Sequence, residues 1–102
     1  YQYKIVDIIT ELEDYGVNVV VHDPLATKEE VKNEYNIELV EKDTLSNLHA
    51  VVIAVPHEEY KQTLTMEYLD SLYANDKKVL IDIKGMLNKK EFEANNYLYW
   101  RL

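Results

Sequence analysis

The stretch "AVVIAVPHEEYKQ", residues Ala50–Gln62, passes from an apolar run to a charged run across one proline. Ala50–Val55 is short, apolar and rich in β-branched residues, which is typical of a strand buried on both faces of a parallel sheet. Pro56 has no N–H to donate to a neighbouring strand, so the strand must end by that residue. His57–Gln62 then predicts a short helix. The stretch indicates a strand-to-helix corner, the repeating unit of α/β domains.

The same pattern occurs earlier, in "VNVVVHDPLATKEEV" (Val17–Val31). Val17–Val21 predicts a second buried strand. Thr27 with Glu30 three residues later matches a capping box, so we expect a helix from there to about Tyr35. Strand and helix again meet at a polar turn.

A third corner follows Val79–Ile83, a buried strand that Gly85 terminates. The remaining expected elements have weaker patterns. They are an amphipathic helix on Ile5, Ile8, Ile9 and Leu12 capped by Gly16, a short strand over 37–39, a helical turn over 44–48, helices over 66–73 and 88–94, and a last strand over 97–100.

Strands that alternate with helices predict one α/β domain over residues 1–102, with three layers and a mainly parallel sheet. A doubly wound domain normally starts with a strand, whereas this chain starts with a helix. We therefore expect the first central strand upstream, and a gap between Val17–Val21 and Ala50–Val55. These strands would pair directly, or another chain would fill the gap.

Composition excludes several function classes. The 102 residues carry a net charge of −8 from 11 basic and 19 acidic residues, which disfavours nucleic-acid binding. With no cysteine, the chain has no disulfide, no cysteine-ligated zinc and no thiol nucleophile. No apolar run approaches the roughly 20 residues of a membrane span. We expect a cytoplasmic domain without a metal site.

Ligands of open parallel sheets bind beyond the carboxyl ends of the strands, so the polar corners are the candidate sites. Asp23 could hold a ribose in a dinucleotide fold, but that role needs a Gly-rich turn. The chain has two glycines, Gly16 and Gly85, and no GxGxxG. We interpret Asp23 and Pro24 as a turn in which Asp23 caps local amides.

Lys84 is the strongest candidate ligand-binding residue. It follows a buried strand and precedes Gly85, which lets a ligand approach the backbone. A phosphate or sugar-nucleotide contact and a solvated surface lysine are both open readings. His57 could act as an acid, a base or a phosphate ligand, or could serve only the helix start, and we assign it no role. The aromatic Tyr97–Trp100 is more consistent with an edge strand than with a base-stacking surface.

The order of "VDIITELEDYGVNVVVHDPLATKEEVKNEYNIEL", "AVVIAVPHEEYKQ", "VLIDIKGML" and "YLYWRL" resembles the C-terminal UDP-binding domain of the UDP-glucose/GDP-mannose dehydrogenase family. The likeness covers essentially the whole chain. It is closest to the bacterial UDP-N-acetyl-hexosamine and UDP-N-acetylmannosamine 6-dehydrogenase branch, which serves capsule and O-antigen synthesis. The "DP-x-A" corner with "KEEV" and the "ID-x-KG" turn are its most specific parts.

The resemblance implies a Rossmann-like fold and a domain of a larger NAD-dependent enzyme, a homodimer that oxidises a UDP-sugar to a UDP-uronic acid for surface polysaccharide synthesis. The NAD site and the catalytic cysteine would lie in other domains, so this chain alone would be inactive. A segment like "FKxNxxDxR" would precede it. The family's basic turn residue corresponds to Lys84, with Asp82 and Gly85 beside it, which gives a substrate-binding set of Lys84, Gly85 and Asp82.

A different class of function stays open: a free-standing, non-enzymatic α/β module that uses a Tyr-rich face to bind a protein. An upstream reading frame with "FKxNxxDxR" and a cysteine-containing region would favour the dehydrogenase. A start codon near Tyr1 would favour the module.

Overall fold

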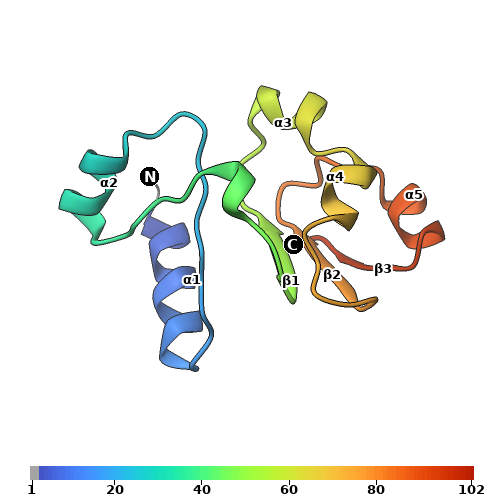
Figure 1. Cartoon of the computed structure of the whole chain (residues 1–102), viewed down its shortest axis with the longest axis horizontal. Helices are drawn as coiled ribbons and strands as arrows, with labels where there is room; N and C mark the ends of the chain where they lie inside the picture. The colour runs from blue at the N-terminus through green and yellow to red at the C-terminus, as the bar shows by residue number, and fades with distance from the viewer. Residues whose placement is uncertain (1–2) are drawn as a thin grey trace. The chain divides into compact units, whose positions relative to one another are not determined.

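The computed structural model describes residues 3–102, which form two compact units (Figure 1). One unit ends at Leu45, and the other spans Ser46–Leu102. The second unit contains the sheet and the turn that carries Lys84.

The sheet of the second unit has three parallel strands: β1 (Ala50–Ile53), β2 (Lys78–Asp82) and β3 (Tyr97–Trp100). Their order is β1-β2-β3, so β2 is central and β3 is an edge strand, as predicted. The register aligns Val51 with Leu80 and Leu80 with Tyr99. Parallel strands joined through helices confirm the predicted α/β class.

Three short helices connect these strands: α3 (Glu58–Thr63), α4 (Met66–Asp70) and α5 (Lys89–Ala94). All three lie close to their predicted ranges. Side-chain caps fix two of the starts, because the Thr65 hydroxyl accepts from the Tyr68 amide at 3.1 Å and Asn88 accepts from the Glu91 amide at 3.0 Å. Local sequence therefore determines where these helices begin.

The two faces of the sheet differ in burial. One face is covered, with Leu80 fully buried and Tyr97 and Tyr99 nearly so. The other face carries Val52, Leu98 and Trp100, which are 41%, 52% and 62% exposed in the structure. The expectation that the first strand of the sheet is buried on both faces is therefore wrong for β1.

The first unit contains α1 (Tyr3–Asp14), α2 (Lys28–Tyr35) and the 3-10 helix η1 (Lys42–Thr44). Its core is formed by Ile9, Val31, Ile37 and Leu39. Gly16 ends the α1 region at φ +84°, where its amide donates to the Glu13 carbonyl at 2.9 Å. This left-handed cap is the predicted one.

Val17–Val21 is not a strand, which corrects the sequence prediction. Val21 makes a single parallel bridge to Leu39, and no ladder extends from it. Val17 and Val20 are 47% and 50% exposed. Apolar β-branched composition favours a strand, but a strand forms only where a second segment pairs along its length. The expected strand over 37–39 likewise reduces to the Leu39 bridge.

Two smaller expectations about the first unit are also wrong. Thr27 occupies the N-cap of α2, but its side chain makes no capping hydrogen bond. The helical turn expected over 44–48 lies instead at η1, before Leu45. The single domain over 1–102 and the upstream central strand stay predictions.

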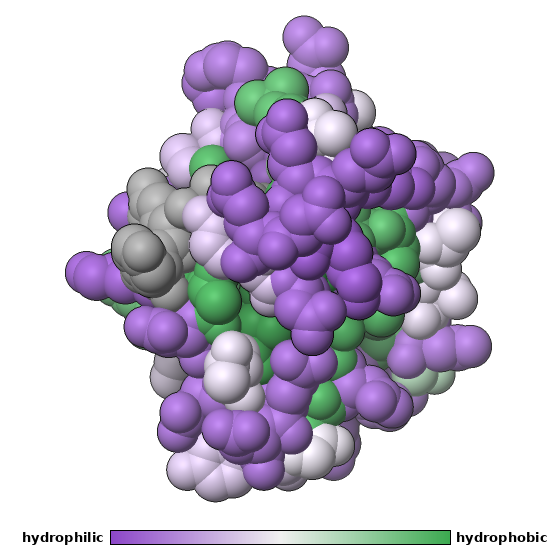
Figure 2. Space-filling view, turned by 90° about the vertical axis from the view of Figure 1, so that its left-hand side faces the viewer, coloured by the Kyte–Doolittle hydropathy of each residue, from purple (hydrophilic) through white to green (hydrophobic). Residues whose placement is uncertain are grey.

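Figure 2 shows a face covered mainly by hydrophilic side chains, with smaller apolar areas between them. No helix among residues 3–102 has the length and apolar character needed to cross a bilayer.

Candidate functional site

The candidate site lies at the carboxyl edge of the sheet in the second unit. β1 ends there at Ile53, β2 at Asp82 and β3 at Trp100. The Ile83 amide donates to the Ile53 carbonyl at 3.0 Å and ties the segment after β2 to the end of β1. The segment Ile83–Leu87, here called the Lys84 turn, leaves the sheet from this edge.

Asp82 shapes the Lys84 turn from within. Its side chain is fully buried. One carboxylate oxygen accepts from the Met86 amide at 3.0 Å, and the other accepts from the Leu87 amide at 2.8 Å. A buried carboxylate needs such partners, because an unpaired one is costly to desolvate. Asp82 therefore folds the turn, and its place in the substrate-binding set stays a prediction.

Two residues of the last strand region hold the same turn from outside. The Tyr99 hydroxyl donates to Asp82, and Arg101 Nε donates to the Tyr99 hydroxyl at 3.0 Å. Arg101 Nη2 donates to the Leu87 carbonyl at 2.7 Å. Burial, and then the hydrogen bond to Asp82, raises the pKa of Tyr99. The hydrogen bond to Tyr99 raises the pKa of Arg101.

Gly85 makes this arrangement possible. It has φ +65°, a conformation that costs other residues energy. A Cβ at this position would lie 3.3 Å from Arg101 Nε. From the sequence we expected a ligand to approach the backbone at Gly85. The Arg101 side chain fills part of that space.

Lys84 is presented to solvent by the turn. It is exposed, and within the described residues no hydrogen bond or ion pair engages its ammonium group. Its neighbours Asp82 and Leu87 have their polar groups occupied inside the turn. The arrangement offers an unneutralised cation on a fixed backbone, which suits an anionic ligand.

His57 follows β1 at the same edge of the sheet, as the N-cap of α3. Its ring meets the Tyr60 ring edge-on at 5.3 Å between centroids. Its amide donates to the Val55 carbonyl at 3.0 Å. These contacts belong to the start of α3, and His57 keeps no assigned role.

The corner at Asp23 is a turn, as interpreted from the sequence. Asp23 Oδ1 accepts from the Leu25 amide at 2.9 Å and from the Ala26 amide at 3.2 Å. The neighbouring His22 Nδ1 lies 3.0 Å from the Val40 carbonyl. These contacts occupy the side chains within the first unit.

A hollow of roughly 460 Å³ in the first unit is less suited to an anion. Lys28 and Lys32 line it, but Lys28 pairs with Glu41 at 2.5 Å and Lys32 with Glu38 at 3.2 Å. Across residues 3–102 no group of three or more metal-ligating side chains comes together.

The sequence predicted Lys84, Gly85 and Asp82 as site residues; the first two lie in the Lys84 turn and Asp82 precedes it at the end of β2. It did not indicate the contacts of Tyr99 and Arg101 with this turn. The register that pairs Ile81 with Trp100 places Arg101 level with the end of β2. The available signal was that β2 ends in "ID" and that Arg101 directly follows the "YW" at the end of β3. This signal indicates that Arg101 lies near Asp82 only when the register of the two strands is known.

Comparison with known proteins bears on the whole chain. Residues 4–89 match the model of the UDP-glucose/GDP-mannose dehydrogenase family, UDP binding domain. The chain is 35% identical over 99 residues to Protein CapL of Staphylococcus aureus, covering 97% of this chain and 22% of that protein.

Two further relatives are UDP-N-acetyl-D-glucosamine 6-dehydrogenases. The Salmonella typhi protein is 34% identical over 91 residues, covering 89% of this chain and 21% of its own length. The Pseudomonas aeruginosa protein is 33% identical over 86 residues, with 84% and 20% covered. The chain thus spans about a fifth of these relatives. No solved structure matches the chain significantly.

Proposed function

This chain belongs to the UDP-glucose/GDP-mannose dehydrogenase family, as its UDP-binding domain, and from that premise we propose that it binds a UDP-sugar through Lys84. The observation that carries the proposal is the Lys84 turn, which holds an exposed, unpaired lysine at the carboxyl edge of a parallel sheet. Ligands of such sheets bind at that edge.

A diphosphate suits this turn chemically. It carries negative charge and several acceptor oxygens, and a lysine ammonium binds phosphate oxygens through charge-assisted hydrogen bonds. The surrounding chain is acidic, with a net charge of −8. Among the described residues no ion pair involves the Lys84 ammonium group, so no carboxylate competes with a phosphate for it.

The activity that we propose for the whole enzyme is oxidation of the sugar C6 hydroxyl to a carboxylate in two steps, each of which reduces one NAD, with water supplying the second carboxylate oxygen. The named relatives support a UDP-N-acetyl-hexosamine as the sugar nucleotide. The residues of this chain do not fit NAD, because its two glycines are isolated and form no phosphate-binding turn. The chain also has no cysteine to serve as a nucleophile. Both tasks therefore fall to other domains, and this chain alone would be inactive.

The biological setting follows from the same premise. We expect a cytoplasmic homodimer that supplies UDP-uronic acids for surface polysaccharide. The remaining domains of the enzyme and the UDP-sugar are its partners. None of these expectations involves nucleic acid or a membrane.

The alternative is a protein-interaction module. The exposed apolar face of β1 and β3, with Val52, Leu98 and Trp100, favours it. The Tyr-rich face expected from the sequence does not support it at Tyr97 and Tyr99, because both are buried. The apolar face would then bind a partner whether or not a nucleotide is present.

An NMR titration tests the proposed site. UDP is added to the isotopically labelled chain, with AMP as the control nucleotide. We expect shifts in the amides of the Lys84 turn for UDP and smaller ones for AMP, and a loss of the UDP shifts in Lys84→Ala. If saturating UDP does not shift the amide signals of the Lys84 turn, the assignment of the UDP site to this turn is contradicted.

A further inference from the structure

Arg101 and Tyr99 contact the turn that presents Lys84 but are not themselves in the proposed binding set. The Arg101 guanidinium links β3 to the turn, because Nε donates to the Tyr99 hydroxyl and Nη2 donates to the Leu87 carbonyl. The Tyr99 hydroxyl in turn donates a hydrogen bond to the buried Asp82 carboxylate. One side chain after β3 thus braces the loop that follows β2.

We propose that Arg101 and Tyr99 are positioning residues for Lys84, which set the affinity for the diphosphate without touching it. This inference rests on the proposed function. Three hydrogen bonds hold the backbone that follows Lys84: the Met86 and Leu87 amides donate to the Asp82 carboxylate, and Arg101 donates to the Leu87 carbonyl. A fourth, from the Tyr99 hydroxyl, holds the Asp82 carboxylate itself. A lysine on a fixed backbone reaches a phosphate at a smaller entropic cost than one on a mobile loop.

The geometry of Arg101 favours positioning over direct binding. Its Nε and Nη2 atoms already donate within the protein, and its side chain lies against Gly85. The guanidinium also lies over the Tyr99 ring, with Cζ 5.6 Å from the centroid. A planar fork satisfies these partners at the same time, and a lysine ammonium at the same place cannot.

Conservative variants separate this role from a simple charge effect. Tyr99→Phe removes the hydroxyl and keeps the ring, which stacks near Phe92 at 6.2 Å between centroids. Arg101→Lys keeps the charge and loses the fork. If Arg101 attracted the diphosphate through its charge, Arg101→Lys would bind UDP-sugar as the wild type does. If it positions the turn, Arg101→Lys fails in the same way as Arg101→Ala.

The test is a double-mutant cycle in the full-length enzyme, read out as the KM for the UDP-sugar. We expect Tyr99→Phe and Arg101→Lys each to raise this KM about 3- to 10-fold, with the KM for NAD unchanged. In a Lys84→Ala background they should add little, because both act through Lys84. Thermal unfolding of each variant identifies any that fail to fold.

The outcomes separate the two proposals. If Lys84→Ala leaves the KM unchanged, the proposed binding role of Lys84 is wrong. If Lys84→Ala raises the KM and Tyr99→Phe does not, the positioning role is overturned while the binding role survives. The same holds if the double variant raises the KM by the product of the two single effects. Faster hydrogen exchange of the Met86 and Leu87 amides in Tyr99→Phe would accompany the expected result.

Discussion

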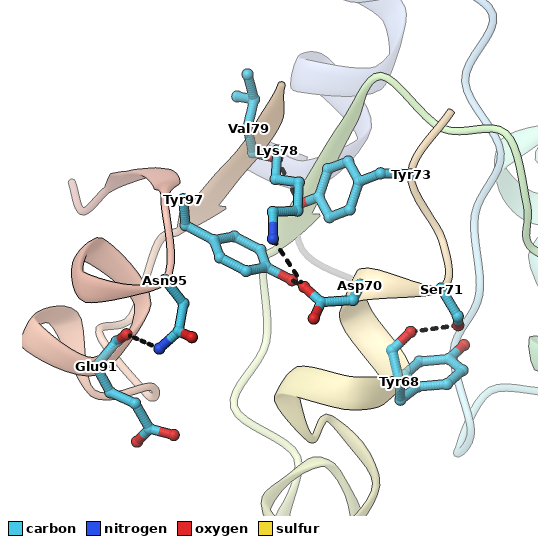
Figure 3. Close-up of polar contacts among 9 residues, drawn as sticks. All are labelled: Tyr68, Asp70, Ser71, Tyr73, Lys78, Val79, Glu91, Asn95 and Tyr97. Atoms are coloured by element: carbon cyan, nitrogen blue, oxygen red, sulfur yellow. Dashed lines mark hydrogen bonds and ion pairs between the residues drawn. The ribbon is translucent and has the colours of Figure 1, made fainter. Parts of the chain in front are cut away.

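The Tyr97 hydroxyl donates a hydrogen bond of 2.6 Å to Asp70 Oδ1 and so joins the start of β3 to the end of α4 (Figure 3). Lys78 Nζ, at the start of β2, contacts the same oxygen at 3.1 Å and lies 4.5 Å from the centre of the Tyr97 ring. This cluster lies at the amino ends of the strands, away from the Lys84 turn. Its contribution is therefore to stability.

We predict that Asp70→Ala lowers the free energy of unfolding by about 1–2 kcal/mol, measured by urea denaturation. The substitution removes the acceptor of Tyr97 and the partner of Lys78. The value is moderate because the Asp70 side chain is 47% exposed. Asp76→Ala, at an exposed turn position between α4 and β2, is the matched control and should cost little. Equal losses of unfolding free energy in the two variants would argue against a stabilising role of the contacts of Asp70 with Tyr97 and Lys78.

The same contacts predict an acid dependence. The Tyr97 hydrogen bond, and then Lys78, holds the pKa of Asp70 below its ordinary value near 3.8. A group with a lowered folded pKa stabilises the fold above its unfolded pKa and loses that contribution as pH falls through the folded value. Asp70→Ala should therefore reduce the loss of stability below about pH 4. An unchanged acid profile would contradict this assignment.

Alkaline solution should destabilise the second unit. Burial raises the pKa of Tyr73, Tyr97 and Tyr99 in the folded state. Their stabilisation is complete below the unfolded value of about 10 and is lost as pH rises above it. Tyr97→Phe should weaken this decline in a series of urea melts between pH 8 and pH 11, roughly the range that spans the titration. Tyr15→Phe, at a tyrosine 79% exposed, is the control and should keep the wild-type decline.

Burial predicts unequal costs for two leucines of adjacent strands. Leu80 is fully buried in β2, and Leu98 is 52% exposed in β3. Leu80→Ala should lower the free energy of unfolding by about 2–5 kcal/mol, and Leu98→Ala by less than about 1 kcal/mol. Comparable losses would mean that the face of Leu98 is covered in solution.

The two glycines test the Arg101 contact. Both have positive φ, so alanine at either position should cost about 1–2 kcal/mol. A Cβ at Gly16 would meet nothing within 4 Å, whereas one at Gly85 would press against Arg101. Only Gly85→Ala should also raise the KM for the UDP-sugar in the full-length enzyme. A normal KM in Gly85→Ala would show that the Arg101 side chain can be displaced without weakening UDP-sugar binding.

The sequence predicted the second unit better than the first. Pro56 and Gly85 are local signals, and the strands that precede them end close to where these residues indicate. Val17–Val21 failed because a strand depends on a pairing partner, and composition does not report one. The exposed face of β1 and β3 was missed for the same reason.

The candidate site divides in a similar way. Asp82 ends β2, and Lys84 and Gly85 follow it closely, so their position at the strand end was enough to predict them as candidates. Arg101 lies 17 residues beyond Lys84 and reaches the turn only through the pairing of β2 with β3. Its two hydrogen bonds depend on strand register, which residue spacing does not determine.

The most direct test of the account is the steady-state KM of the full-length enzyme for its UDP-sugar, compared between wild type, Lys84→Ala and Lys90→Ala. Lys90 is the matched control, since it is an exposed lysine on α5. We predict that Lys84→Ala raises this KM about tenfold and leaves the KM for NAD unchanged. We predict that Lys90→Ala changes neither KM. An unchanged KM in Lys84→Ala would contradict the assignment of the Lys84 turn to UDP-sugar binding.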